Sequence, residues 1–373
     1  MIGLQEKQKN RLDLLQKKNN IIAIASSKGG VGKTLVAANI AYHLTKLNKT
    51  VTIIDLNLAS PGLHALFGIN SPAKCINSLF IDSSTKLTEV VVATKIKNLN
   101  VICDSHHSLG KLEKADLFVD KLLSAVKLLK SDYVIFDLGT GLSKFDTKLF
   151  LSAQTALMIG TPEPTAVKDN FSFLKLCVLH RLEEIYRRDV AALQVIHEAQ
   201  LSYNSALNDN IKNLIKNIMP DTNPRYDNDK LNFFPKYILN MVRDDSDLLY
   251  AQAINSAVNE RLRLKLQQVG FIPFCRQLRA LLKKSSIEDV LKNANGAKNF
   301  YENLANELVA DSWVATKYNA PIKIKKLTKV DRDLYQDDQH LICTSSCARW
   351  GDCSYQHGGY PCKIKYIGFM NTN

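Results

Sequence analysis

The stretch SSKGGVGKT at residues 26–34 decides the fold of this chain. It follows the β-branched run IIAIA at residues 21–25 and opens onto a helix-like stretch, so the sequence predicts a strand, a glycine-rich turn and a helix in that order. Glycines in such a turn let backbone N–H groups close around a chain of phosphates. Lys33 then reaches the β- and γ-phosphates, and the hydroxyl of Thr34 can ligate Mg²⁺. The stretch therefore predicts a loop that binds a nucleotide through its phosphates.

This loop departs from the usual phosphate-loop pattern G-x-x-x-x-G-K-[ST] in two ways. Ser27 stands where the first glycine is expected, and Lys28 adds a second cation ahead of the glycines. The predicted nucleotide-binding residues are Ser27, Gly29, Gly30, Val31, Gly32, Lys33, Thr34 and Leu35.

Short β-branched runs alternate with helix-like stretches from the loop to about residue 310. The runs are TVTIIDL, NLNVICD, DYVIFDLG, ALMIGTPEP, KYILNMV and GFIPF. Such alternation is typical of βαβ units around a mostly parallel sheet. The predicted fold class is therefore α/β, a doubly wound and mostly parallel sheet with a helical insert and a small cysteine-rich C-terminal module.

Three regions are predicted along the chain. Residues 1–20 form a polar N-terminal helical arm with leucines at helical spacing. Residues 21–319 form the nucleotide-binding domain, and a helical insert at about residues 181–235 ends in the loop-like stretch MPDTNPRYDNDK. Residues 320–373 form a cysteine-bearing tail.

Composition narrows the class of protein. With 373 residues, 46% of them hydrophobic, the chain can bury a sizeable core. It has neither eighteen uninterrupted apolar residues nor a signal-like start, which predicts a cytoplasmic protein. The net charge of +13 is spread along the chain, so a basic functional surface and ordinary solvated helix faces both stay open. Four cysteines in apolar settings are predicted to be reduced core residues, namely Cys75, Cys103, Cys177 and Cys275.

The motif KGGVGKT at residues 28–34 resembles the deviant Walker A motif of the MinD/ParA family of ATPases, which have a P-loop NTPase fold of the SIMIBI type. In that family the first lysine contacts the phosphates bound to a neighbouring subunit. The resemblance implies that Lys28 and Lys33 act together in catalysis, that the cofactors are ATP and Mg²⁺, and that ATP binding is linked to formation of a homodimer.

The resemblance also assigns roles to residues beyond the loop. Asp55 ends a strand about twenty residues after the loop and would help hold hydrated Mg²⁺, together with Thr34 and the Walker B-like Asp137. Carboxylates at strand ends suit Mg²⁺, which prefers a few hard oxygens and retained waters. Asn240 and Pro273 lie where relatives flank the adenine.

Asn57 breaks the family pattern. The first switch of the family usually reads D-x-D, and its second aspartate orients or activates the attacking water, whereas this chain reads DLN. An amide can hydrogen-bond a water but cannot accept its proton. Phosphoryl transfer relies mainly on positioning and charge stabilisation, so the sequence predicts slow or partner-stimulated hydrolysis.

The tail carries a different chemistry. Cys343, Cys347, Cys353 and Cys362 lie within twenty residues, spaced C-x3-C-x5-C-x8-C. Four thiolates can surround Zn²⁺ or hold an iron–sulfur cluster, and such ligands can fold a segment that is too small for its own core. Metal binding is the favoured interpretation, with unligated thiols and disulfides as the alternatives.

The expected function is an ATP-dependent switch that acts in the spatial organisation of a bacterial cell, at the division site or in flagellar number and placement. Its expected partners are a second copy of the chain and a protein activator or effector, with peripheral association at the inner face of the cell membrane. The alternatives are an iron–sulfur or metal-carrier scaffold ATPase that uses the C-terminal cysteines, and a DNA-partition ATPase. Nucleic acid is the less favoured partner because only the net charge points to it.

Overall fold

The computed structural model describes residues 19–310, apart from residues 59, 70–74, 82–83, 105–114, 202–230 and 294–296. The predicted tail, with Cys343, Cys347, Cys353 and Cys362, and nearly all of the predicted N-terminal arm lie outside the described residues. The same is true of most of the predicted insert, of which residues 181–185 and 190–201 are helical.

The described chain is built around one eight-stranded sheet with strand order β3-β4-β2-β5-β1-β6-β7-β8. Every pairing is parallel except the short antiparallel pair of β3 and β4. The strands are β1 (Asn20–Ala25), β2 (Val51–Leu56), β3 (Val92–Ala93), β4 (Leu99–Ile102), β5 (Tyr133–Leu138), β6 (Thr155–Gly160), β7 (Lys236–Val242) and β8 (Gln267–Pro273). The predicted α/β class and mostly parallel sheet are confirmed, and each β-branched run of the sequence supplies one strand.

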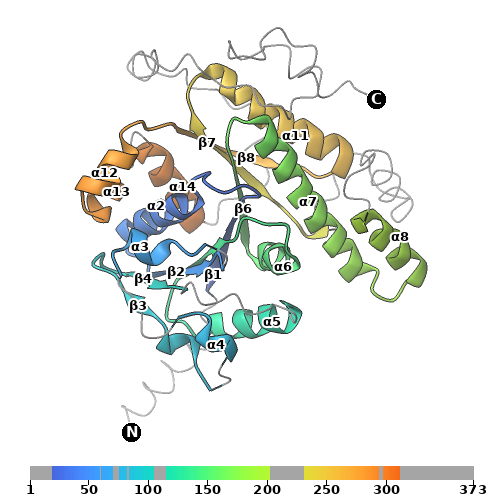
Figure 1. Cartoon of the computed structure of the whole chain (residues 1–373), viewed down its shortest axis with the longest axis horizontal. Helices are drawn as coiled ribbons and strands as arrows, with labels where there is room; N and C mark the ends of the chain where they lie inside the picture. The colour runs from blue at the N-terminus through green and yellow to red at the C-terminus, as the bar shows by residue number, and fades with distance from the viewer. Residues whose placement is uncertain are drawn as a thin grey trace.

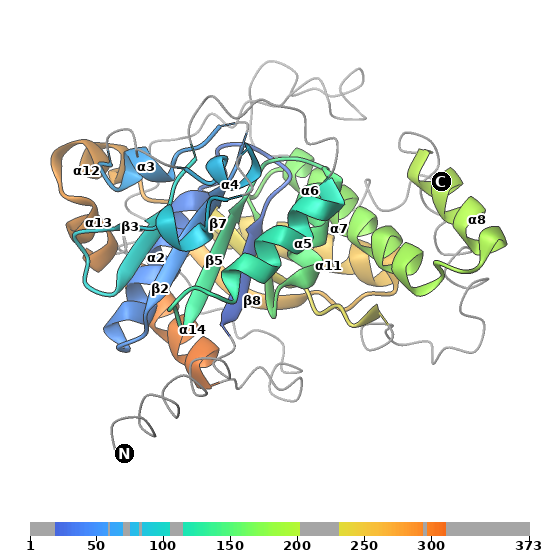
Figure 2. The same cartoon turned by 90° about the horizontal axis from the view of Figure 1, so that it is seen from below.

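Helices cover both faces of this sheet (Figure 1). They are α2 (Lys33–Lys46), α3 (Leu63–Leu66), α4 (Ser78–Ile81), α5 (Ala115–Val126), α6 (Lys144–Ser152), α7 (Pro164–Ile185), α8 (Val190–Leu201), α11 (Leu248–Leu262), α12 (Leu278–Lys284), α13 (Ile287–Asn293) and α14 (Lys298–Ala310). Figure 2 shows α2, α13 and α14 grouped on one side, with α5, α6, α7 and α11 on the other. This is the doubly wound arrangement that the sequence predicts.

Alternating side chains of the central strands feed two hydrophobic cores. On β1, Ile22 and Ile24 pack with α2 and α14, whereas Ala23 and Ala25 pack with α6, α7 and α11. Such a period of two is the signature of a strand buried on both faces. β1 is therefore packed on both faces, and the loop that follows it begins at a well-anchored strand end.

Glycine at residue 160 is required by packing where β6 ends. A Cβ atom at this position would lie 1.8 Å from Oη of Tyr237 and 2.9 Å from Nδ2 of Asn170. No side chain fits in that space, so β6, β7 and α7 approach one another closely beside the phosphate loop.

The four cysteines of the domain only partly match the prediction. All four are thiols rather than disulfides, and Cys103 and Cys177 are buried. Cys75 and Cys275 are only half-buried, so the prediction of core positions is wrong for these two. In the described part of the chain, no helix is both long enough and apolar enough to cross a lipid bilayer.

Candidate nucleotide site

The glycine-rich loop joins the central strand β1 to α2, as the sequence predicts. Gly30 and Gly32 adopt φ values of 77° and 85°, which are left-handed conformations that favour glycine. Gly32 is also the N-cap of α2, and no side chain caps this helix. The first N–H groups of α2 thus lack a partner from a capping side chain, which is the arrangement that binds a phosphate at a helix N-terminus.

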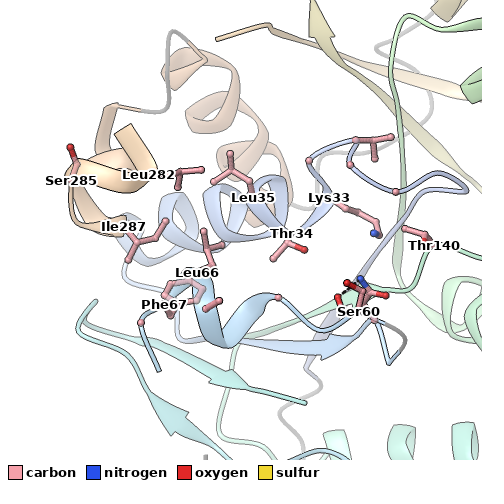
Figure 3. A pocket seen from close by; sticks show the side chains of 18 of the residues that line it. Lys33, Thr34, Leu35, Ser60, Leu66, Phe67, Thr140, Leu282, Ser285 and Ile287 are labelled. Atoms are coloured by element: carbon pink, nitrogen blue, oxygen red, sulfur yellow. Dashed lines mark hydrogen bonds between the residues drawn. The ribbon is translucent and has the colours of Figure 1, made fainter. Parts of the chain in front are cut away.

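A cavity of about 820 Å³ opens over this loop (Figure 3). Polar side chains gather at one end, where Lys33, Thr34, Ser60 and Thr140 lie. The other end is apolar and is lined by Leu35, Leu66, Phe67, Leu282 and Ile287. A charged phosphate chain suits the polar end, and the flat apolar face of a base suits the other.

The residues predicted to hold Mg²⁺ converge beside the loop. Asp55 and Asp137 are paired positions at the carboxyl ends of the neighbouring parallel strands β2 and β5. The hydroxyl of Thr34 donates to Oδ2 of Asp137 over 2.6 Å, while the buried Oδ1 of Asp137 has no hydrogen-bond partner. Hard oxygens in this arrangement, one of them unsatisfied, fit a magnesium ion that keeps several waters.

Burial shapes the charge of both carboxyl groups. Burial, and then the nearby Asp137, raises the pKa of Asp55 to about 7, although N–H groups of Leu63, Asn57 and Gly62 oppose the shift. Burial likewise raises the pKa of Asp137, against the opposing effect of Lys33 and the hydrogen bond from Thr34. Two carboxyl groups this close resist joint ionisation, and a divalent cation between them would relieve that repulsion.

Asn57 closes a tight turn at the edge of the cavity. Its Nδ2 group donates to the carbonyl oxygen of Ser60 over 2.8 Å, and the N–H of Ser60 donates to the carbonyl oxygen of Asn57 over 3.0 Å. Its Oδ1 atom is buried without a hydrogen-bond partner. The amide nitrogen is therefore committed to the turn, and Oδ1 is the atom of this side chain whose hydrogen-bonding capacity is unused.

Asp146 occupies a structural position at the start of α6. Oδ1 accepts a hydrogen bond from the N–H of Gly139 over 3.1 Å, and Oδ2 accepts one from the hydroxyl of Ser143, which in turn caps the helix. Burial raises the pKa of Asp146. This carboxyl group thus holds the turn after Asp137 in place.

Lys28 does not point into the phosphate loop of its own chain. Its ammonium forms an ion pair with Glu163 and lies 3.4 Å from the hydroxyl of Thr165, at the N-terminal end of α7. The side chains of Lys28 and Glu163 are 40% and 50% exposed. An ion pair this exposed is weak, so other partners can compete for the lysine.

Asn170 of α7 compensates for the serine at the first loop position. Its Oδ1 accepts hydrogen bonds from the N–H of Ser27 over 3.2 Å and from the hydroxyl of Ser27 over 2.6 Å. Its Nδ2 donates to the carbonyl oxygen of Ile159 over 3.2 Å. Because Asn170 is only 1% exposed, this amide ties the loop to α7 and β6 from within the core.

Asn240 supports the loop from behind. Nδ2 of Asn240 donates to the carbonyl oxygen of Val31 over 2.7 Å, and the next residue, Met241, has a left-handed φ of 63°. The pairing of β7 with β8 shifts register at this point, and such irregularities re-aim side chains. Pro273 ends β8, and neither it nor Asn240 lines the cavity. Their contact with adenine stays a prediction.

Sequence reasoning missed Glu163, Asn170 and the apolar end of the cavity. The stretch GTPEPTAVKDNFSF contains both Glu163 and Asn170, but nothing in its pattern shows which helix face meets the loop. The side chains of the α12–α13 turn come from about 250 residues beyond the loop, and only the fold brings them to it.

A glycine-rich loop at the central strand, a buried lysine and two strand-end aspartates define a P-loop NTPase. Residues 17–183 match the ParA family model, described as an NUBPL iron-transfer P-loop NTPase. Over this stretch the chain is similar to P-loop NTPases of the ParA/MinD family.

Several known proteins are similar to this chain. The flagellum site-determining protein YlxH of Helicobacter pylori is 31% identical over 177 residues, which cover 45% of this chain and 58% of that protein. The iron-sulfur cluster carrier protein of Rickettsia bellii is 34% identical over 124 residues, covering 32% and 37%. The structure of the septum site-determining protein MinD with Mg-ADP from Pyrococcus horikoshii aligns with a TM-score of 0.52 and 18% identity, covering 80% of this chain and 100% of that one. This structural likeness shows the fold, and the chain spans about half the length of the curated relatives it matches.

Replacing Asn170 with alanine is expected to weaken nucleotide binding. The N–H and hydroxyl of Ser27 would both lose their acceptor, and leaving such groups unpaired costs about 1–3 kcal/mol. We expect the dissociation constant of a fluorescent ATP analogue to rise roughly tenfold in Asn170→Ala. Lys168→Ala, at an exposed position on the same helix turn, is the matched control and should leave the constant unchanged. Equal affinity in both variants would contradict the assigned role of Asn170.

Proposed function

We propose that this protein is an ATP-dependent dimerising switch of the MinD/ParA type. The observation that carries the proposal is the position of Lys28, which directly precedes the cavity-lining Gly29 but is turned toward Glu163. A lysine in this position can leave its weak ion pair and reach the phosphates bound to a second copy. The charge of ATP would then favour the dimer, and its hydrolysis would favour dissociation.

In this proposal each residue around the phosphates has one task. The glycine loop and the N-terminus of α2 bind the phosphates through N–H groups, and Lys33 neutralises the β- and γ-phosphates. Thr34, Asp137 and Asp55 would hold Mg²⁺ and its waters. Bound Mg²⁺ would supply charge stabilisation for phosphoryl transfer, and the protein's part is to position the groups around it.

We propose that hydrolysis is slow until a partner assists. Oδ1 of Asn57 can accept a hydrogen bond from a water, but the amide cannot take the water's proton. Asp146 is engaged by Gly139 and Ser143, so the described geometry offers it no role as the missing base. A protein activator could supply the missing group at the exposed rim of the site.

The cellular role is proposed from the relatives. Proteins named as flagellum site-determining and septum site-determining are among the similar ones. We therefore propose a role in the spatial organisation of a bacterial cell, as a cytoplasmic protein that associates with the inner face of the membrane through a partner.

An iron–sulfur carrier function is the second candidate. The matching family model is described as an iron-transfer NTPase, and one relative is an iron-sulfur cluster carrier protein. Among the residues that the structure describes, no group of three or more His, Cys, Asp or Glu side chains is arranged to hold a metal. The candidate thus depends on Cys343, Cys347, Cys353 and Cys362. Anaerobic purification separates the two functions, because a brown protein with near-ultraviolet absorption supports the carrier and a colourless zinc protein opposes it.

Lys28→Ala is expected to abolish ATP-dependent dimerisation while ATP binding to the single chain persists. The lysine contacts Glu163 and Thr165 rather than its own loop, so its loss should spare the phosphate contacts within the chain. Sedimentation velocity with Mg-ATP should show dimers for the wild type and for the control Lys168→Ala, but monomers for Lys28→Ala. Unaltered dimers in Lys28→Ala would disprove the role of this lysine in the partner's site.

Asn57→Asp is expected to speed phosphate release by at least tenfold, since a positioned general base contributes about 10²–10⁴-fold. The carboxylate loses the hydrogen bond that Nδ2 donates to Ser60 and gains the ability to accept a proton from water. Phosphate release is measured with Mg-ATP at protein concentrations that favour dimers. Asn57→Ala is the control, because it removes the same turn bond without adding a carboxylate. Equal rates in the wild type and Asn57→Asp would mean that another group already activates the water.

A further inference from the structure

Two cysteines lie near each other beside the sheet edge that carries Asp55. Cys103 directly follows β4, and Cys75 lies just before α4. The N–H of Ile76 donates a hydrogen bond of 2.9 Å to the carbonyl oxygen of Cys103. The Cα atom of each cysteine is two bonds from an end of this hydrogen bond, so the two Cα atoms lie less than about 8 Å apart. Disulfide-bonded cysteines have Cα atoms about 4.4–6.8 Å apart, which lies within this limit.

The side chains are also close enough to sense each other's charge. Burial, followed by the nearby Asp55, Cys75 and Asp104, raises the pKa of the Cys103 thiol to about 12. Cys103 is fully buried, whereas Cys75 is half-buried. The pair therefore consists of one thiol that small oxidants can reach and one that is shielded behind it.

Strand register places this pair next to Asp55. β2 and β4 are parallel, with Ile54 paired to Ile102, so Asp55 and Cys103 follow at the carboxyl ends of adjacent strands. Asp55 accepts hydrogen bonds from the N–H groups of Gly62 and Leu63, at the start of α3. Residues 60–69, here called the α3 segment, begin near this point, and several of them line the cavity.

We propose that Cys75 and Cys103 form a reversible disulfide that restrains the α3 segment and so makes the nucleotide site sensitive to peroxides. The regulatory half of this proposal rests on the proposed nucleotide-binding function, whereas the disulfide itself does not. Reversible disulfides in reducing compartments are usually redox-sensing rather than structural, which matches two thiols beside a binding site.

The chemistry needs a peroxide as the oxidant. The thiolate of Cys75 attacks hydrogen peroxide, the O–O bond breaks, and Cys75 becomes a sulfenic acid while hydroxide leaves and takes up a proton to form water. The thiol of Cys103 loses its proton, its sulfur attacks the sulfenic sulfur, and a second water leaves as the S–S bond forms. Two electrons pass from the thiols to the peroxide. The high pKa of Cys103 makes its attack the slower step.

The disulfide would restrict the motion of the α3 segment, which lines the cavity. The α3 segment is joined to β2 at its start, and the new bond would tie the chain beyond it to β4. Restraining both sides of a segment reduces the conformations it can reach. Because this segment lines the cavity and supplies the N–H donors to Asp55, we expect nucleotide to enter and leave more slowly in the oxidised protein.

The disulfide is tested by peptide mapping of the full-length protein. The protein is treated with hydrogen peroxide, its remaining thiols are alkylated, and it is digested without reduction. We expect a Cys75–Cys103 linked peptide in the wild type and in Cys275→Ser, the control that removes another half-buried thiol, and no such peptide in Cys75→Ser. The proposal is overturned if Cys103 is recovered alkylated while Cys75 is over-oxidised or paired with another cysteine.

The effect on the site is tested by the dissociation rate of a fluorescent ATP analogue with Mg²⁺. We expect oxidation to lower this rate at least threefold, dithiothreitol to restore it, and Cys75→Ser to be insensitive. An unchanged rate in fully cross-linked protein would overturn the regulatory half. Failure of the reduced protein to bind the analogue would instead count against the proposed function, and the linked peptide would still decide whether the disulfide forms.

Discussion

Parallel pairing of β1, β2 and β5 is the constraint on which the nucleotide site depends. All three strands end at the same edge of the sheet, so the phosphate loop, Asp55 and Asp137 meet there although Asp137 lies 103 positions after Thr34 of the loop. Burial at this edge raises the pKa of both carboxyl groups, and the nearby Asp137 adds to the rise at Asp55. Hydrogen bonds from backbone N–H groups to Asp55, and Thr34 and Lys33 beside Asp137, oppose part of this rise in pKa. A bound cation would favour the ionised form of both carboxyl groups further.

Helix α7 is the second support of the loop. Its N-terminal region contacts two consecutive loop residues, through Glu163 and Thr165 at Lys28 and through Asn170 at Ser27. The first contact is exposed and weak, whereas the second is buried and joined to β6. This difference lets the lysine change partners while the loop beneath it keeps its shape.

Ser27, which departs from the usual phosphate-loop pattern, and Asn57, which departs from the family's first switch, both have local hydrogen-bond partners. Ser27, in place of a glycine, brings a hydroxyl that Asn170 accepts, and Asn57, in place of an aspartate, closes a turn with Ser60. Each exchange thus adds a hydrogen bond that the usual residue could not make. The exchange at residue 57 removes a proton acceptor from the site, but it leaves the fold around the site intact.

The sequence by itself determined the α/β class, nearly every strand and the identity of the phosphate loop, because β-branched runs, glycine spacing and the GKT ending are local features of the chain. It also singled out Asp55 and Asp137, since each ends a strand. It could not show that Asn170 and Glu163 support the loop, that Asn240 bonds Val31, or that Cys75 lies near Cys103. Those contacts join residues far apart along the chain. Strand order, helix rotation and register decide them, and these follow only from packing the whole domain.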